Sequence, residues 1–424
     1  MLSRLRLTEL SLLVAPILLA LVGLANVNLV RTGAVVPLDG HPIVVLAGFL
    51  VVAHAALTVR CRNVDQLILP IAGMLTALGL ILVGRLESEM LERQTLWIVV
   101  GALFLIVVVG LPKPVSWLKE YKYTWAVLGL LLAAVTLVFG KDVNNSGARL
   151  WLGYGDWLFQ PSEGLKILLV VFLAGYLDDK RELFASGSQR VGFLRVPGLP
   201  HLGPMAVMWG LSILLLIGQR ELGPPFLLFG VFLAMLYVAS SRGIYVWGGL
   251  AMFSAAAYGL YNVFSHVQTR VDIWLNPWTD PDGKAYQIVQ SLLALATGGI
   301  AGTGLGFGHP NTIPAVHTDF PFSAVGEELG LFGTLAVVLL YLLLTYRGLK
   351  IALGASDSFQ QLLATGLTTT IGLQALIIIA GNIKLIPLTG ITLPFVSYGG
   401  SSLVTNFIAI GLLLRTSEGR ARST

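Results

Sequence analysis

Twelve apolar segments, each close to the length needed to cross a lipid bilayer, constrain the fold of this chain more than any other feature of its sequence. A membrane-spanning helix needs about 20 predominantly apolar residues, so twelve would use about 240, more than half of the chain. Only 12% of the 424 residues are charged, too few to cover a soluble protein of this length. We therefore predict an all-α polytopic membrane protein with about twelve transmembrane helices, and exclude the soluble globular, disordered and fibrous classes.

The twelve segments extend over almost the whole chain. The first is too long for the core of a signal peptide and has no clear cleavage site, so we expect it to be retained. The sixth is short and follows a polar connection, so we expect it to be tilted or buried among its neighbours. The segments are roughly 9–30, 42–59, 67–84, 95–111, 122–140, 164–177, 203–218, 222–240, 244–265, 322–345, 361–383 and 396–414.

Lysine and arginine residues predict which connections face the cytoplasm, because they are enriched on that side of a membrane. With the N-terminus inside, most of the 27 basic residues are cytoplasmic, and so is connection 178–202. Three long connections, 85–94, 141–163 and 266–321, then lie outside, and the last is long enough to be expected to carry function. The basic residues are scattered over short loops, so the net charge of +5 reflects topology and no nucleic-acid partner is predicted.

Cysteine and histidine usage excludes the common metal and redox sites. Cys61 is the only cysteine, which rules out a disulfide framework and a CxxC site. The six histidines show neither HExxH nor paired-ligand spacing, so no zinc site is predicted.

Charged and polar residues form several clusters in the predicted outer connections. Glu163 and Lys166 are three residues apart and share one face of a helix that begins near Ser162. They form either a capped helix end with a local ion pair or one wall of a polar cavity, because ionisable groups are costly in a bilayer. Glu221 lies in a tight turn between two spans, and either serves that turn or lines the same cavity.

The other clusters lie in the second half of the chain. Asp280 belongs to a run of turn-forming residues, where it either caps its own backbone or takes part in chemistry. Alternating glycines at 298–308 lack the context of a nucleotide site and indicate a flexible or closely packed loop. Glu327 and Glu328 are adjacent in a predicted helix, so one can face a cavity while the other packs. Together the clusters indicate one extracytoplasmic site for a polar or anionic substrate carried on a lipid.

Six strings of residues, in order along the chain, resemble the SEDS family of peptidoglycan polymerases, which includes RodA, FtsW and SpoVE. The resemblance implies a ten-helix core at 61–416, preceded by two additional helices in 1–60, as in actinobacterial RodA relatives, and followed by a short basic cytoplasmic tail at 417–424. Arg149 lies one residue earlier than the family's arginine, and Glu221 replaces an aspartate. The strings are Asn145–Lys166, Gln219–Gly223, Asn276–Ser291, Gly298–Gly308, Thr318–Gly330 and Pro387–Ser401.

The resemblance implies a peptidoglycan glycosyltransferase that polymerises lipid II outside the membrane and releases undecaprenyl pyrophosphate. An acceptor 4-hydroxyl would attack the anomeric carbon of the donor sugar with inversion and form a β-1,4 bond. That step needs a base for the hydroxyl and positive charge for the pyrophosphate. Asp280 matches the family's catalytic aspartate and is the predicted base. Substrate contacts are predicted for Arg149, Gln160, Ser162, Glu163, Lys166, Glu221, Gln290, Ser291, Thr318, Asp319, Glu327, Lys384, Ser397 and Ser401.

The positive charge has two alternative sources. One is the basic side chains Lys166, Arg149, Arg270 and Lys384. The other is a divalent cation, magnesium or manganese, held by outer carboxylates, since hard oxygen ligands suit these ions. No other cofactor is predicted, and no metal ligands are identified.

Asp280 is favoured over Asp282 as the base by the local sequence as well as by the family match. Pro281 restricts Asp280 to extended conformations, so we expect its side chain to be aimed away from the turn. Asp282 precedes Gly283, a common turn pair, so we expect it to bond to nearby backbone.

The resemblance also implies partners and a location. Lipid II is the expected substrate, a class B penicillin-binding protein the expected partner, and the bacterial cytoplasmic membrane and its lipids the surroundings, with the active site on the extracytoplasmic side. The alternative function is a flippase for lipid-linked cell-wall precursors, which would show polar groups through the whole membrane depth. A scaffold without chemistry is a third alternative, but it would not need acidic outer clusters.

Overall fold

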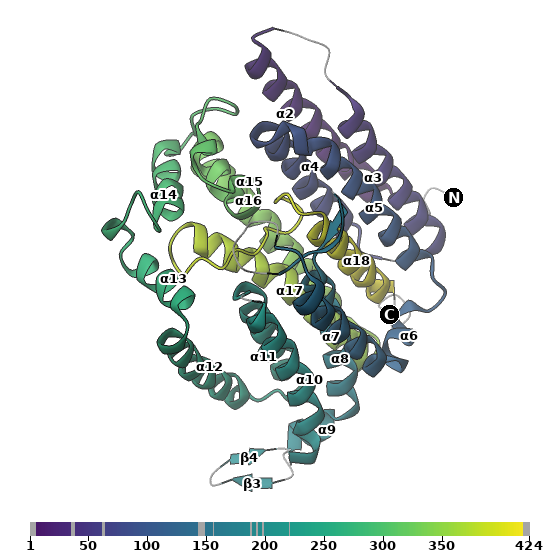
Figure 1. The fold of residues 1–424 in the computed structure, drawn as a ribbon. Coiled ribbons are helices and arrows are strands. Elements are labelled where there is room, and N and C mark those ends of the chain that lie inside the picture. Colours follow the sequence, from purple (N-terminus) through teal and green to yellow (C-terminus); the bar gives the residue numbers. More distant parts are fainter. Residues whose placement is uncertain are drawn as a thin grey trace.

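The computed structural model describes residues 6–34, 39–61, 64–142, 149–155, 157–186, 189–191, 194–196, 199–219 and 221–418. These residues form a bundle of helices with two small β-hairpins (Figure 1). The longer helices are α2 (Val14–Thr32), α3 (His41–Arg60), α4 (Ile68–Leu86), α5 (Leu91–Gly110), α7 (Lys122–Phe139), α8 (Pro161–Asp179), α10 (Leu199–Gly218), α11 (Gly223–Ser240), α12 (Gly243–Val263), α16 (Pro321–Leu353), α17 (Ser358–Asn382) and α18 (Gly400–Ser417).

Shorter elements connect these helices. The short α-helices are α1 (Leu7–Leu12), α6 (Pro114–Glu120), α9 (Arg181–Ser186), α13 (Ser265–Leu275), α14 (Tyr286–Gly298) and α15 (Val316–Asp319), and the 3-10 helices are η2 (Ser88–Met90), η3 (Pro277–Thr279) and η4 (Pro310–Thr312). We call the end of the bundle with α13, α14 and α15 the loop-rich end. Most of the predicted tail, 419–424, lies outside the described residues, as do residues 143–148 of the first polar cluster.

The prediction of a helical polytopic membrane protein is confirmed. Nine helices of the described chain are long and apolar enough to cross a membrane. The other three predicted spans are also helical, and they form α8, α18 and the apolar part of α10, Gly203–Gly218. Helix α8 carries charges at both ends, and it is buried against α7, α11 and α17, as expected for the sixth segment.

Two antiparallel hairpins were not expected from the sequence. Strand β1 (Leu152–Tyr154) pairs with β2 (Trp157–Phe159) at the loop-rich end, and the chain between them turns at Gly155 with a φ of 57°. Strand β3 (Gln189–Val191) pairs with β4 (Leu194–Val196) and projects from the opposite end of the bundle (Figure 1). Strands of three residues are too short to show a period of two in the sequence.

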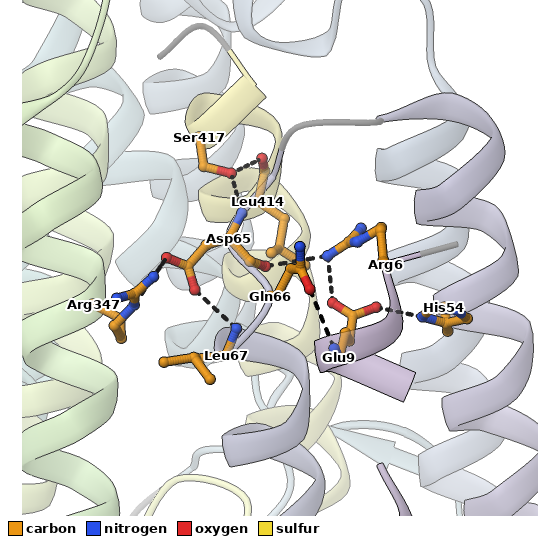
Figure 2. A network of polar contacts seen from close by, with 9 residues as sticks. All are labelled: Arg6, Glu9, His54, Asp65, Gln66, Leu67, Arg347, Leu414 and Ser417. Atoms are coloured by element: carbon orange, nitrogen blue, oxygen red, sulfur yellow. Dashed lines mark hydrogen bonds and ion pairs between the residues drawn. The ribbon is translucent and has the colours of Figure 1, made fainter. Parts of the chain in front are cut away.

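The N-terminal helices α2 and α3 pack against α4 and α5, and polar contacts join them to the rest of the fold at the end opposite the loop-rich end. Figure 2 shows the buried Glu9 carboxylate between Arg6 and His54, with 2.7 Å from Glu9 Oε1 to His54 Nδ1. Arg6 Nη2 donates to the Asp65 carbonyl at 3.2 Å, and Asp65 accepts from Arg347 Nε at 2.9 Å. The network thus joins the N-terminus to the start of α4 and the end of α16.

The glycine segment 298–308 is built into an opening in helix α16. Gly330 has a φ of 65° and a ψ of −160°, so the helix is interrupted there. The amides of Thr303 and Gly304 donate to the carbonyls of Glu327 and Glu328, each at 2.9 Å. A closely packed loop, one of the two readings from the sequence, is therefore correct, and these amides are already engaged by the protein.

Candidate active site

A cavity of about 1030 Å³ opens at the loop-rich end, where most of the predicted site residues were expected. Its walls come from α5, the β1–β2 hairpin, α8, the turn between α10 and α11, α13, α15 and the irregular segment 389–399 before α18. Irregular backbone is thus found where it lines a cavity, as membrane energetics require. Six predicted substrate-contact residues line it: Gln160, Glu163, Glu221, Thr318, Asp319 and Ser401.

Glu163 and Lys166 form a buried ion pair at the wall of this cavity. Lys166 Nζ lies 2.8 Å from Glu163 Oε2, and both side chains are at least nine-tenths buried. Lys166 also donates to Gln374 Oε1 at 2.8 Å, and Gln374 Nε2 donates to the Thr392 carbonyl at 2.8 Å. The reading of this pair as part of a polar cavity is therefore correct, and the pair joins α8 to α17 and to the irregular segment.

Glu221 reaches the same cavity from the turn between α10 and α11. Its Oε1 accepts a hydrogen bond from Gln160 Nε2. Ser162 lies beside its carboxylate, but neither Ser162 Oγ nor Glu221 Oε2 has a partner with hydrogen-bond geometry among the described residues. Burial, with the nearby charge of Glu163 as a second cause, raises the pKa of Glu221 to about 7.

Arg270 and Asp319 separate the large cavity from a smaller one of about 190 Å³, which both residues also line. Arg270 Nη1 donates to the carbonyls of Leu388 and Thr389, each at 3.0 Å. Burial lowers the pKa of the Arg270 guanidinium and raises the pKa of the Asp319 carboxyl. Lys384 lines only the smaller cavity, so it lies next to the main site rather than in it.

Asp280 lines neither cavity, and its side chain points differently from our expectation. It is exposed in the turn after η3, and Oδ2 accepts a hydrogen bond from the Lys284 amide at 3.0 Å. The argument that Pro281 aims Asp280 away from the turn is therefore wrong, as is the expectation that Asp282 caps the backbone, because Asp282 makes no hydrogen bond within the described chain. Lys284 lines the smaller cavity, which places Asp280 beside it.

Three predicted contact residues serve helix packing instead. Ser291 Oγ lies 2.6 Å from Ser323 Oγ and donates to the Asn382 carbonyl at 2.9 Å, which joins α14, α16 and α17. Ser397 Oγ donates to the Thr318 carbonyl at 2.6 Å. Glu327 Oε1 accepts from the His309 amide at 2.8 Å.

The expectation that one of Glu327 and Glu328 faces a cavity is also wrong. Glu328 is held by Arg85 Nε at 2.9 Å and by the Gly306 amide at 3.0 Å, so both carboxylates bind the segment that packs on α16. Of the other predicted contacts, Gln290 is half-buried on α14 outside both cavities, and Arg149 is exposed and donates to the Val138 carbonyl at 3.2 Å.

Several cavity residues were not anticipated from the sequence. Arg93 and Trp97 of α5 line the large cavity, and Gln374 of α17 lies behind it. His317 of α15, which precedes the predicted contacts Thr318 and Asp319, also lines it. Burial lowers the pKa of His317. Gln374 could have been identified from the sequence, because an amide inside an apolar span needs a polar partner.

The described residues do not form a metal cage of their own. No group of three or more His, Cys, Asp or Glu side chains among them is placed to hold an ion. Two carboxylates that line the large cavity, Glu163 and Glu221, already have Lys166 and Gln160 as partners.

Comparisons with known proteins place the chain in one family. A family model for a cell cycle protein, FtsW/RodA/SpoVE, matches residues 65–422. The peptidoglycan glycosyltransferase RodA of Mycobacterium bovis is 40% identical over 381 residues, which cover 87% of this chain and 81% of that protein. The probable peptidoglycan glycosyltransferase FtsW of Geobacter metallireducens is 34% identical over 366 residues, covering 83% and 94% respectively.

Solved structures show the same likeness. A chain from a peptidoglycan synthase complex, described for its structural coordination of polymerization and crosslinking, aligns with a TM-score of 0.70 at 26% identity, over 85% of this chain and 99% of that chain. The rod shape determining protein RodA of Thermus thermophilus aligns with a TM-score of 0.59 at 25% identity, over 84% and 97%.

Proposed function

Since this chain belongs to the FtsW/RodA/SpoVE family of peptidoglycan glycosyltransferases, we propose that it polymerises lipid II into glycan strands and releases undecaprenyl pyrophosphate. The observation that carries this proposal is the large cavity at the loop-rich end, with the buried Glu163–Lys166 pair in its wall. A cavity with charged walls at one end of a membrane bundle suits a substrate whose head is anionic and whose tail stays in lipid.

The reaction makes two demands on the site. The acceptor 4-hydroxyl must lose a proton as it attacks the anomeric carbon, and the departing pyrophosphate must be stabilised. We assign the first task to Asp280, which is exposed and held by the backbone amide of Lys284, a residue that lines the smaller cavity. Arg270 and Arg93 line the cavity, and Lys384 lines the adjoining one, so they supply positive charge near the pyrophosphate.

We do not assign Lys166 the role of a cation that stabilises the pyrophosphate. Its charge is already shared between Glu163 and Gln374, so it organises the wall of the cavity. A magnesium or manganese ion would need substrate oxygens to complete its ligands, which is how magnesium usually binds.

We further propose that the protein lies in the bacterial cytoplasmic membrane, with the loop-rich end and its cavity outside. The lysine and arginine bias supports this orientation. We also propose a class B penicillin-binding protein as the partner that crosslinks the strands. The likeness to a chain of a peptidoglycan synthase complex supports this partner.

The test of this function compares two neighbouring aspartates. Purified protein with fluorescent lipid II should form polymer, alone or with its partner. Asp280→Asn keeps the shape but removes the base, so polymerisation should fall by about 100-fold or more while lipid II binding remains. Asp282→Asn is the matched control, and it should keep substantial activity.

Two outcomes would contradict the proposal. If Asp282→Asn were inactive and Asp280→Asn active, the base would be misassigned. If the wild-type protein moved labelled lipid II between leaflets without forming polymer, it would be a flippase.

A further inference from the structure

We propose, resting on the polymerase function above, that Glu221 is a second acid–base residue of the transfer, which donates a proton to the departing pyrophosphate while Asp280 accepts one from the acceptor hydroxyl. The two carboxyl groups have opposite surroundings, since Asp280 is exposed and Glu221 is buried in the wall of the cavity. Pairs of carboxyl groups in such different environments commonly divide into one acid and one base.

The geometry of Glu221 suits a proton donor. One carboxylate oxygen, Oε1, is held by Gln160 Nε2, which fixes the orientation of the group. The other, Oε2, is buried in a side chain that lines the cavity, and Ser162 lies beside the carboxylate without hydrogen-bond geometry to it. A buried carboxylate oxygen without a donor is costly, and a proton on that oxygen both removes the cost and supplies a donor.

The charges around Glu221 favour its protonated form. Glu163 and Glu221 are close enough to repel each other, and the one lysine beside them, Lys166, already pairs with Glu163. The three groups carry one excess negative charge, which a single proton on Glu221 removes. Burial accordingly raises the pKa of Glu221 to about 7, near the pH at which a general acid works best. The other charged or titratable groups that line the cavity are Arg93, His266, Arg270, His317, Asp319 and Tyr398.

The proposed step balances in atoms and charge. The bond from the anomeric carbon to the pyrophosphate oxygen breaks and its electron pair stays on that oxygen, which takes the proton of Glu221. The acceptor oxygen forms the new bond to the anomeric carbon, and its proton passes to Asp280. The site is restored when Asp280 loses a proton to water and Glu221 regains one.

The test is the pH dependence of polymerisation. The protonated form of Glu221 is lost as pH rises through about 7, so the wild-type rate should fall across that range. Glu221→Gln cannot donate a proton, so its rate at pH 6 should drop by about 100-fold and the decline at alkaline pH should vanish, with lipid II binding retained. Glu120→Gln, at an exposed position at the far end of the bundle, is the matched control and should behave as wild type.

A second readout does not depend on activity. In folded protein the pKa of Glu221 lies above the ordinary 4.5, so the proton stabilises the fold, and stability should decline as pH rises from about 4.5 to 7. Thermal unfolding in detergent should show this decline in wild type and a smaller one in Glu221→Gln. If Glu221→Gln does not fold, Glu221→Asp keeps a carboxyl group, and its alkaline limb should move from the wild-type position.

Each failure has a separate meaning. A wild-type protein that makes no polymer contradicts the proposed function. A wild type that makes polymer, with a Glu221→Gln variant that keeps both the rate and the alkaline decline, overturns the role of Glu221 alone.

Discussion

At the scale of the residue, burial decides what the ion pair between Glu163 and Lys166 contributes. An exposed pair is worth at most about 1 kcal/mol, because water and salt screen it. A buried pair is different, since removal of one partner leaves an uncompensated charge that costs about 3–5 kcal/mol. Lys166 also holds Gln374, so the loss of Glu163 or Lys166 disturbs the cavity wall as far as Thr392.

We therefore expect Glu163 and Lys166 to act as one unit. Glu163→Ala and Lys166→Ala should each lower polymerisation strongly, and the double variant should be little worse than the poorer single one, with a coupling energy of about 2 kcal/mol or more. The matched control is Lys122 with Asp179, a pair 2.5 Å apart whose carboxylate is 40% exposed. Its alanine variants should be nearly additive, and similar additivity at Glu163 and Lys166 would leave only a helix-capping role.

The side chains whose positions could best be predicted from the sequence are those that contact residues close to them along the chain. Glu163 and Lys166 share a face because they are three residues apart, and both were placed correctly. Asp280 was assigned correctly to a turn, but its orientation depends on which backbone amide lacks a partner, and here that is the Lys284 amide. Glu327 could not be predicted, because its partner, the His309 amide, comes from a loop whose path is set by tertiary packing.

At the scale of the element, the interruption of α16 depends on glycines, because the absence of a side chain lets the backbone of segment 298–308 approach the helix. Gly302 has a φ of 82°, and a methyl group there would lie 2.3 Å from the Glu328 carbonyl oxygen. Gly299 has a φ of 53°, but the space beside it is open. The two positions separate the cost of the backbone conformation from the cost of a steric clash.

Gly302→Ala should accordingly destabilise the protein more than Gly299→Ala. A backbone conformation that only glycine adopts readily costs another residue about 1–3 kcal/mol, and overpacking adds about 1–3 kcal/mol. We expect Gly299→Ala to lower the free energy of unfolding by the conformational cost alone, and Gly302→Ala to lower it by both costs. Thermal unfolding in detergent measures the difference. Equal losses would mean that the Glu328 carbonyl can move away without cost.

The positions of the helices could be predicted from the sequence better than their roles could. All twelve predicted spans are helical, because a run of apolar residues in a membrane has few alternatives. Hairpins β1–β2 and β3–β4 were missed because their strands have only three residues. The extension of α16 to Leu353 was missed because its last turns, around Arg347 and Lys350, are more polar than the span.

At the scale of the whole molecule, the two ends of the bundle differ in their polar chemistry. The loop-rich end has the cavity of about 1030 Å³, and the opposite end has a smaller one of about 440 Å³ beside ion pairs that join elements of the fold, such as Lys119–Asp178 and Arg347–Asp65. The larger cavity at the loop-rich end fits a substrate site on that side.

The sidedness can be measured with single cysteines in a Cys61→Ser background. An impermeant thiol reagent applied to intact cells should label Asn311→Cys, which is exposed at the loop-rich end. It should not label Ser356→Cys, which is exposed between α16 and α17, nor cysteines in connection 178–202, until the cells are opened. Labelling of Ser356→Cys in intact cells would reverse the orientation.

The burial of α4 has a consequence for what holds its neighbours in place within the membrane. Of its apolar window, 89% is buried within the structure, and α2 lies so close that a methyl group on Gly23 would come within 2.3 Å of Ile81. In a membrane, an apolar helix face gains little by exchanging lipid for another apolar helix. Close packing therefore has to hold α2 against α4, and Gly23 sets how closely the two helices approach.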